Sequence, residues 1–147
     1  MQVFLVHHAD AVGPAVDPQR PLSTRGRTQA EWLAGRARAA GCRPEAIWHS
    51  GKLRARQTAE AFLRACSPSA DFRTVRGLRP GDPPEWMRDE LVAESRTVLV
   101  VGHMPQVALL ARTLCPACED FPLHGLVALE PDEHGRLAET WRAEPPD

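Results

Sequence analysis

The sequence has no excess of charge of either sign, because 18 lysine and arginine residues stand against 19 aspartate and glutamate residues. A net charge of −1 argues against the strongly basic surface by which proteins bind nucleic acids or anionic membranes. Long apolar runs are also missing, and the first residues lack the basic and apolar segments of a signal peptide. We therefore expect a cytoplasmic protein that binds neither nucleic acid nor membrane.

Metal-binding and redox patterns are equally scarce. The four cysteines are Cys42, Cys66 and the pair in Cys115-Pro-Ala-Cys118. This CxxC follows an apolar helical pattern, whereas a redox CxxC normally opens a helix. A zinc site would need further ligands, and the sequence has no second CxxC and no HxxxH. We expect reduced thiols, no metal and no cofactor.

Residues 1–147 have the length of one domain, and neither a repeat nor a linker interrupts them. Short apolar runs alternate with helical patterns, which predicts an α/β fold. The run at 97–102 is apolar on both faces, so it is expected at the centre of a parallel sheet. Strands are predicted at 3–6, 46–50, 72–75, 97–102, 126–129 and 137–142. Helices are predicted at 24–40, 53–66, 83–94 and from 105 onward.

Polar side chains of the types that take part in phosphoryl transfer follow three of these strands. His7 and His8 follow the first, His103 follows the central one, and Ser50 leads into Arg54 after the second. The carboxyl ends of neighbouring parallel strands meet at one edge of a sheet. A neutral imidazole is a nucleophile, and a guanidinium is the preferred clamp for phosphoryl oxygens. The pattern predicts phosphoryl transfer without a metal.

At these positions the sequence resembles the histidine phosphatase (phosphoglycerate mutase-like) superfamily. The resemblance implies a three-layer α/β/α sandwich with a mostly parallel central sheet. The small size and local features such as Leu78-Arg79-Pro80-Gly81-Asp82 resemble its SixA-type phosphohistidine phosphatases. The matching motifs cover nearly the whole chain in the family's order: His7-His8-Ala9, Pro21 to Ala30 (PLSTRGRTQA), Ser50 to Glu60 (SGKLRARQTAE) and Val101-Gly102-His103-Met104-Pro105.

Carried over by position, the resemblance makes His8 the nucleophile, Arg54 the clamp on the phosphoryl oxygens and His103 a hydrogen-bond donor to the transferring group. His8 must then be neutral, and its other ring N–H should bond to a backbone carbonyl. His103 is more useful when protonated, and a bound phosphate would raise its pKa.

Two positions depart from the family pattern. His7 replaces the arginine before the nucleophile, and losing that clamp could cost about 2–4 kcal/mol of transition-state stabilisation. A bound phosphate that charges His7, or a nearby Arg56 or Arg25, would compensate. Pro80 stands where many branches have a glutamate acid, and Asp82 and Glu85 are interpreted as helix-capping residues. A missing acid favours phosphohistidine, because its leaving group is an imidazole rather than an alkoxide.

The sequence thus predicts a phosphohistidine phosphatase that works through a phospho-His8 intermediate and takes a phosphorylated partner protein, such as a phosphotransfer domain in signal transduction. His7, Arg54 and His103 would bind the phosphoryl group. Two alternatives stay open: a phosphatase of small phosphomonoesters, and a degraded member that binds phosphoryl groups without turnover. His49 is expected to be a strand-end side chain near the pocket, and His124 and His134 are expected to lie toward the surface.

Overall fold

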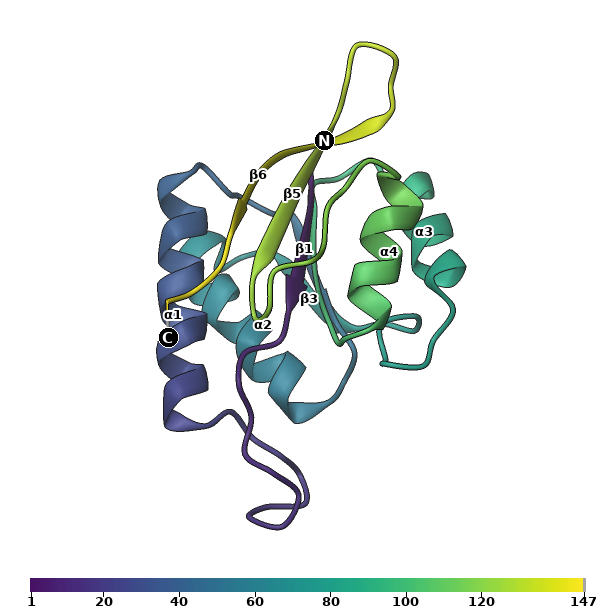
Figure 1. Cartoon of the computed structure of the whole chain (residues 1–147). Coiled ribbons are helices and arrows are strands. Elements are labelled where there is room, and N and C mark those ends of the chain that lie inside the picture. Colours follow the sequence, from purple (N-terminus) through teal and green to yellow (C-terminus); the bar gives the residue numbers. More distant parts are fainter. Residues whose placement is uncertain (147) are drawn as a thin grey trace.

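The computed structural model describes residues 1–146, which form a six-stranded sheet between two pairs of helices (Figure 1). The strand order is β3-β2-β4-β1-β5-β6. Strands β1 to β4 run parallel to one another, β5 is antiparallel to β1, and β6 is antiparallel to β5. Helices α1 and α2 cover one face, and α3 and α4 cover the other. The expected three-layer α/β/α sandwich with a mostly parallel sheet is confirmed. The strands are β1 (Val3–His7), β2 (Ala46–His49), β3 (Asp71–Thr74), β4 (Val98–Gly102), β5 (Leu126–Pro131) and β6 (Leu137–Ala143). The helices are α1 (Thr24–Ala39), α2 (Leu53–Cys66), α3 (Pro84–Ala93) and α4 (Gln106–Leu114).

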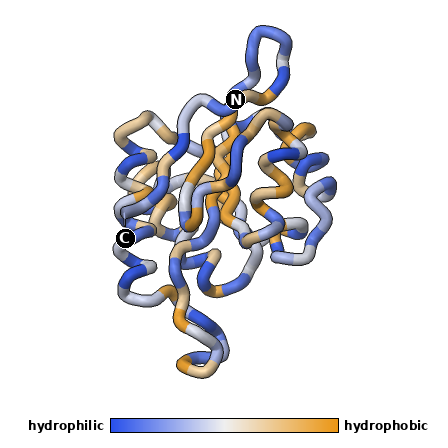
Figure 2. The backbone as a smooth tube through the Cα atoms, viewed as in Figure 1, coloured by the Kyte–Doolittle hydropathy of each residue, from blue (hydrophilic) through white to orange (hydrophobic). Residues whose placement is uncertain are grey.

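The central strands are apolar on both faces because each face packs against helices. In β1, Phe4 and Val6 join the core beneath α1 and α2, while Val3 and Leu5 join the core beneath α3 and α4. The hydrophobic residues of the central strands therefore lie inside the molecule, and the hydrophilic residues lie in the loops and on the outer faces of the helices (Figure 2). Alternate side chains of a central strand pack into the two cores on opposite faces of the sheet. Such a strand therefore needs a continuous run of apolar residues.

Most predicted element boundaries agree with the structure within one or two residues, and α2 agrees at both ends. Ser23 caps α1, since its hydroxyl accepts a hydrogen bond from the Gly26 N–H at 2.9 Å. The predicted cap of α3 is wrong. Its N-cap is Pro83, and the Asp82 carboxylate instead accepts from the Arg79 N–H at 3.0 Å, because it closes the preceding turn. Cys115 follows the last residue of α4, which confirms that the CxxC lies at a helix end.

Three parallel strands bring their carboxyl ends to the same level of the sheet. β4 lies between β2 and β1, and Val101 is in register with both Val6 and His49. The chain segments that follow these strands, beginning at His8, Ser50 and His103, therefore leave the sheet side by side. This register confirms the predicted convergence of three strand ends and creates the candidate site.

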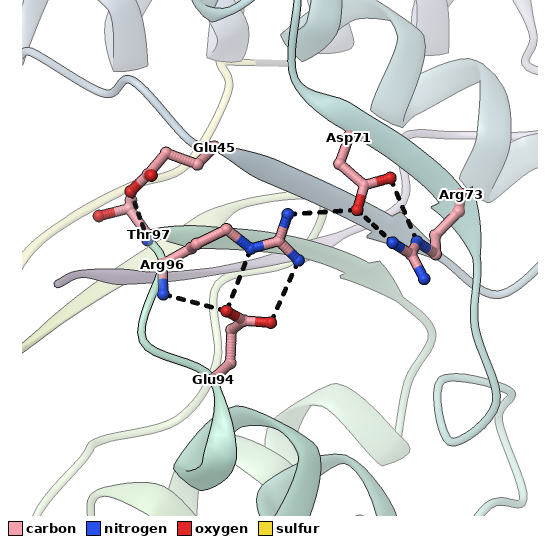
Figure 3. A network of polar contacts seen from close by, with 6 residues as sticks. All are labelled: Glu45, Asp71, Arg73, Glu94, Arg96 and Thr97. Carbon is pink, nitrogen blue, oxygen red and sulfur yellow. Dashed lines mark hydrogen bonds and ion pairs between the residues drawn. The ribbon is translucent and has the colours of Figure 1, made fainter.

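The opposite end of the sheet carries a network of ion pairs (Figure 3). Arg96 donates to both carboxylate oxygens of Glu94 and to Asp71, the first residue of β3. Thr97, just before β4, donates its N–H to the Glu45 carboxylate at 3.1 Å. These contacts tie together the starts of β2, β3 and β4, and they lie a full strand length from the histidines. No helix within residues 1–146 is long and apolar enough to span a bilayer.

Candidate active site

His8 leaves β1 with one ring nitrogen fixed and the other free to react. Its Nδ1 lies 2.7 Å from the backbone carbonyl oxygen of Ala9. A carbonyl can only accept, so Nδ1 carries the proton and Nε2 carries the lone pair. Burial lowers the pKa of His8 to about 4, against the opposing effect of the Ala9 hydrogen bond, and the charge of Arg54 lowers it further. The imidazole is therefore neutral at pH 7, as the sequence led us to expect.

The family-like motifs of α1 and α2 hold the backbone that follows His8. The Ala9 N–H donates to the Thr58 hydroxyl at 3.0 Å, and that hydroxyl donates to the Arg54 carbonyl at 2.8 Å. The Asp10 N–H donates to the Gln29 side-chain oxygen at 2.9 Å. Gly26 allows this approach, because a Cβ there would lie 1.9 Å from the Asp10 carbonyl oxygen. The motif residues thus fix the loop after His8.

His103 follows β4 and lies beside His8, with the ring centroids 4.9 Å apart. Its Nε2 shares a 2.7 Å hydrogen bond with the Ser50 hydroxyl. That hydroxyl also accepts from the Lys52 N–H, and it can either accept from Nε2–H with its second lone pair or donate its own proton to Nε2. In the second case the ring proton of neutral His103 is on Nδ1, a buried atom with no hydrogen-bond partner within residues 1–146. Burial, His8 and Arg54 lower the pKa of His103 to about 3, so the protein itself holds this ring neutral.

Arg54 and Arg20 both act on His8 and His103 through their charge, and sequence analysis identified only Arg54. Arg54, on the first turn of α2, is close enough for its charge to lower the pKa of His8 and His103. Its buried Nε also has no hydrogen-bond partner within residues 1–146. Arg20 is the residue that was missed. It acts on His8, His103 and Arg54 from the loop after β1, with its backbone at φ +50° and its Nε donating to the Val12 carbonyl at 3.0 Å. It stands just before the Pro21 motif, where no spacing rule marks it.

His7 is uncharged and buried, with 5% of its surface exposed. Its Nδ1 accepts a hydrogen bond from the His124 backbone N–H at 2.8 Å, so its own proton is on Nε2. Burial and the neighbouring histidines lower its pKa to about 3. The expectation that a phosphate charges His7 conflicts with this geometry, because a proton on Nδ1 would break the bond to His124. His7 is therefore a neutral ring whose hydrogen-bond donor is its Nε2–H.

His124 belongs to the site, and its assignment to the surface was wrong. Its ring stacks on His7 with centroids 4.8 Å apart and planes 9° apart. Its Nδ1 lies 2.8 Å from the His8 carbonyl oxygen, to which it must donate. It occupies the left-handed region at φ +54°, just before β5. Because β5 runs antiparallel to β1, its start meets the end of β1. The pairing of β5 with β1 would have placed His124 in the site, but the sequence pattern did not predict which strand lies next to β1 on that side.

The sequence analysis also considered Arg56, Arg25 and His49. Arg56 is an exposed residue of α2 whose guanidinium is 3.9 Å from Glu60. Arg25 lines a hollow together with His124 and Glu144. His49 is buried, and its Nδ1 accepts from the Gly51 N–H at 3.1 Å. No group of three or more histidine, cysteine, aspartate or glutamate side chains in residues 1–146 is arranged to hold a metal ion.

Comparison with known proteins agrees with this arrangement. The sequence profile of the histidine phosphatase superfamily (branch 1) matches residues 7–89. The phosphohistidine phosphatase SixA of Escherichia coli (strain K12) is 31% identical, over 99% of this chain and 94% of that protein. The structure of the protein histidine phosphatase SixA complexed with tungstate superposes with a TM-score of 0.87 at 29% identity, covering 99% of this chain and 97% of that one. The structure of a putative SixA from Agrobacterium tumefaciens gives a TM-score of 0.82 at 26% identity, covering 99% and 98%. With its fold, its motifs and its nearly full-length relatives in agreement, the chain belongs to the histidine phosphatase superfamily.

Proposed function

We propose that this protein hydrolyses phosphohistidine on a partner protein through a covalent phospho-His8 intermediate. The observation that carries the proposal is the state of His8. Its Nδ1–H is engaged by the Ala9 carbonyl, its Nε2 lone pair is free, and its pKa of about 4 keeps it neutral. A nucleophile in that state needs no base to activate it.

In the first step, Nε2 of His8 attacks phosphorus while the bond from phosphorus to the substrate nitrogen breaks. The substrate leaves as neutral imidazole if its ring is already protonated, so the enzyme need not supply a proton. In the second step, water attacks phosphorus, the His8 N–P bond breaks, and inorganic phosphate leaves. The positive charge on the phosphorylated His8 ring is stabilised by the Ala9 carbonyl that accepts its Nδ1–H.

The surrounding groups suit the charge that develops on the phosphoryl oxygens. Arg54 and Arg20 supply fixed positive charge, and His103 and His7 supply neutral N–H donors. The buried Nε of Arg54 and Nδ1 of His103 lack a partner within residues 1–146, and a phosphoryl oxygen is the kind of acceptor that would satisfy them.

The carboxylates near the site support a substrate with an N–P bond. Asp82 accepts a hydrogen bond from the Arg79 N–H at 3.0 Å and so serves the turn that precedes α3. Glu85 lies in the first turn of α3, where a carboxylate is favoured by the helix dipole. Asp82 thus has a structural partner of its own, and the position of Glu85 is explained by the helix dipole. A phosphomonoester would need an acid to protonate its alkoxide, whereas a phosphohistidine does not.

The test is dephosphorylation of a phosphohistidine protein by the unmodified chain and by His8→Ala, with the intact mass of the acid-quenched enzyme read in parallel. We expect turnover and a phosphoryl adduct for the unmodified chain, and neither for the variant. Phosphate binding without turnover or adduct would show instead a member that has lost its activity. Faster turnover of a sugar or aryl phosphate than of phosphohistidine would favour the phosphomonoesterase.

A further inference from the structure

A groove of about 460 Å³ opens beside the histidines, at the carboxyl ends of β2 and β3. Ser50, which hydrogen-bonds His103, forms its inner end. The groove continues outward over the loop that joins β3 to α3, the segment between those labels in Figure 1. Its lining residues are Ser50, Thr74, Val75, Arg76, Arg79, Asp82 and Trp86. A molecule with its phosphoryl group at His8 would have neighbouring atoms in this groove.

The loop that forms the groove is fixed by contacts to the core. Leu78 is fully buried, and the Gln106 side chain donates to the Gly77 carbonyl at 2.6 Å. Gly77 has φ +99°, and a Cβ there would lie 3.3 Å from the Met87 nitrogen. The Asp82 N–H donates to the Arg79 carbonyl at 3.1 Å, opposite the bond from the Arg79 N–H to the Asp82 carboxylate. The groove is thus built in advance, which lowers the entropic cost of binding.

The chemistry of the groove favours an anionic polypeptide. The lining includes two guanidinium groups, those of Arg76 and Arg79, and one carboxylate, that of Asp82, which already accepts from a backbone N–H. The Arg76 guanidinium stacks on the Trp86 ring at 3.9 Å from its centroid. Stacking uses the face of the guanidinium and leaves its N–H edge for carboxylate oxygens. Trp86 itself is 41% exposed, an unusual degree for so large a side chain.

We infer that this groove binds an acidic segment next to the phosphohistidine of the protein substrate, with aspartate or glutamate side chains on Arg76 and Arg79. The inference rests on the proposed function for the position of the phosphoryl group. It adds a substrate preference that His8, Arg54 and His103 do not provide, because these residues contact only the phosphoryl group in the proposed mechanism. The groove lies outside that cluster, so its charges act on sequence context rather than on the transferred group.

The experiment uses three synthetic peptides that carry one phosphohistidine flanked by aspartates, by alanines or by lysines. The specificity constant kcat/KM is measured for each with the unmodified chain and with Arg76→Glu/Arg79→Glu. The Kd of the same peptides is measured with a non-hydrolysable phosphonate analogue in place of the phosphohistidine. The matched control is Arg88→Glu/Arg112→Glu, which reverses the charge of one arginine of α3 and one of α4 that do not line the groove.

We expect the unmodified chain and the control to prefer the aspartate peptide over the lysine peptide by about tenfold, chiefly through KM, and the groove variant to reverse that order. The same order in the Kd of the analogues supports the inference even if no peptide is turned over, a result that would refute only the proposed function. Equal binding of the three analogues, or a preference that survives in the groove variant, would overturn the inference. A change of the same size in the control would overturn it too.

Discussion

The backbone N–H of His124 donates to Nδ1 of His7 across 2.8 Å, between residues separated by 117 positions in the sequence. This bond decides what His7 can do, because it takes the one lone pair of the neutral ring. His7 is left with a proton on Nε2 and no charge. In place of the arginine of the family pattern, the site therefore has a neutral imidazole that the His124 backbone holds and the His124 ring stacks on.

We expect arginine at position 7 to raise kcat/KM only if the His124 side chain is removed as well. An arginine would have to occupy the buried space in which the two rings stack, and overpacking of that kind costs about 1–3 kcal/mol. In His124→Gly the backbone keeps its N–H and its φ of +54° without strain. We expect the double variant His7→Arg/His124→Gly to exceed His124→Gly by roughly thirtyfold in kcat/KM, from about 2 kcal/mol of transition-state stabilisation.

The measurement is a double-mutant cycle on kcat/KM for phosphohistidine, with the thermal midpoint of each variant as a check on folding. His7→Arg alone should be slower or less stable than the unmodified chain. Independent effects of the two substitutions on kcat/KM would contradict the coupling. Faster turnover by His7→Arg alone would show that the His124 ring does not restrict position 7.

The sheet and most of the site could be predicted because they depend on local patterns. Apolar runs, capping residues and strand-end histidines placed β1, β4 and α2, and the side-by-side strand ends followed from parallel packing. Arg20 and His124 could not be placed in this way, because each sits in a loop at positive φ and reaches the site through tertiary contacts. The neutral state of His7 was equally hidden, since it depends on a backbone donor far away in the sequence.

Stability should fall steeply as the pH drops below the normal range of histidine. His7, His8 and His103 have pKa values of about 3, 4 and 3 in the folded protein, below the ordinary value of 6.5. Between about pH 4 and 6.5 the unfolded chain binds more protons than the folded one, so acid favours unfolding. Each histidine contributes a slope approaching about 1.4 kcal/mol per pH unit, and above pH 7.5 these three contribute none.

Urea unfolding at half-unit steps from pH 5 to 8 measures this slope. The matched variant is His7→Asn, whose side-chain oxygen can take the place of Nδ1 as acceptor for the His124 N–H but does not titrate. We expect its slope to be smaller by about 1.4 kcal/mol per pH unit between pH 5 and 6. A variant that keeps the full slope would show that His7 is not held neutral in the folded state.

Arg20 should contribute to phosphate binding although it lies outside the recognisable motifs. Its charge already acts on His8, His103 and Arg54. Arg20→Gln should weaken the binding of inorganic phosphate by about tenfold, the loss expected for one charged hydrogen-bond partner. Arg20→Lys keeps the charge and should lose less. Calorimetric titration at low and high salt tests both, since the difference should shrink with ionic strength. Equal Kd values for the chain and Arg20→Gln would exclude the role.

The contact between α1 and the loop after His8 can be tested with two glycines of one helix. A Cβ at Gly26 would lie 1.9 Å from the Asp10 carbonyl oxygen, whereas a Cβ at Gly35 would meet no atom within 4 Å. Gly26→Ala should cost about 1–3 kcal/mol of unfolding free energy, because the helix must move away from the loop. Gly35→Ala should stabilise α1 by up to about 1 kcal/mol through helix propensity.

The variants Gly26→Ala and Gly35→Ala also distinguish an effect on stability from an effect on catalysis. The displaced loop in Gly26→Ala includes Ala9, whose carbonyl holds the His8 ring, so kcat should fall even well below the melting temperature. Gly35→Ala should keep the kcat of the unmodified chain. Full activity in a folded but destabilised Gly26→Ala would mean that the position of the Ala9 carbonyl does not depend on the α1 contact. The His8 ring would then owe its orientation to the Thr58 hydroxyl and β1 alone.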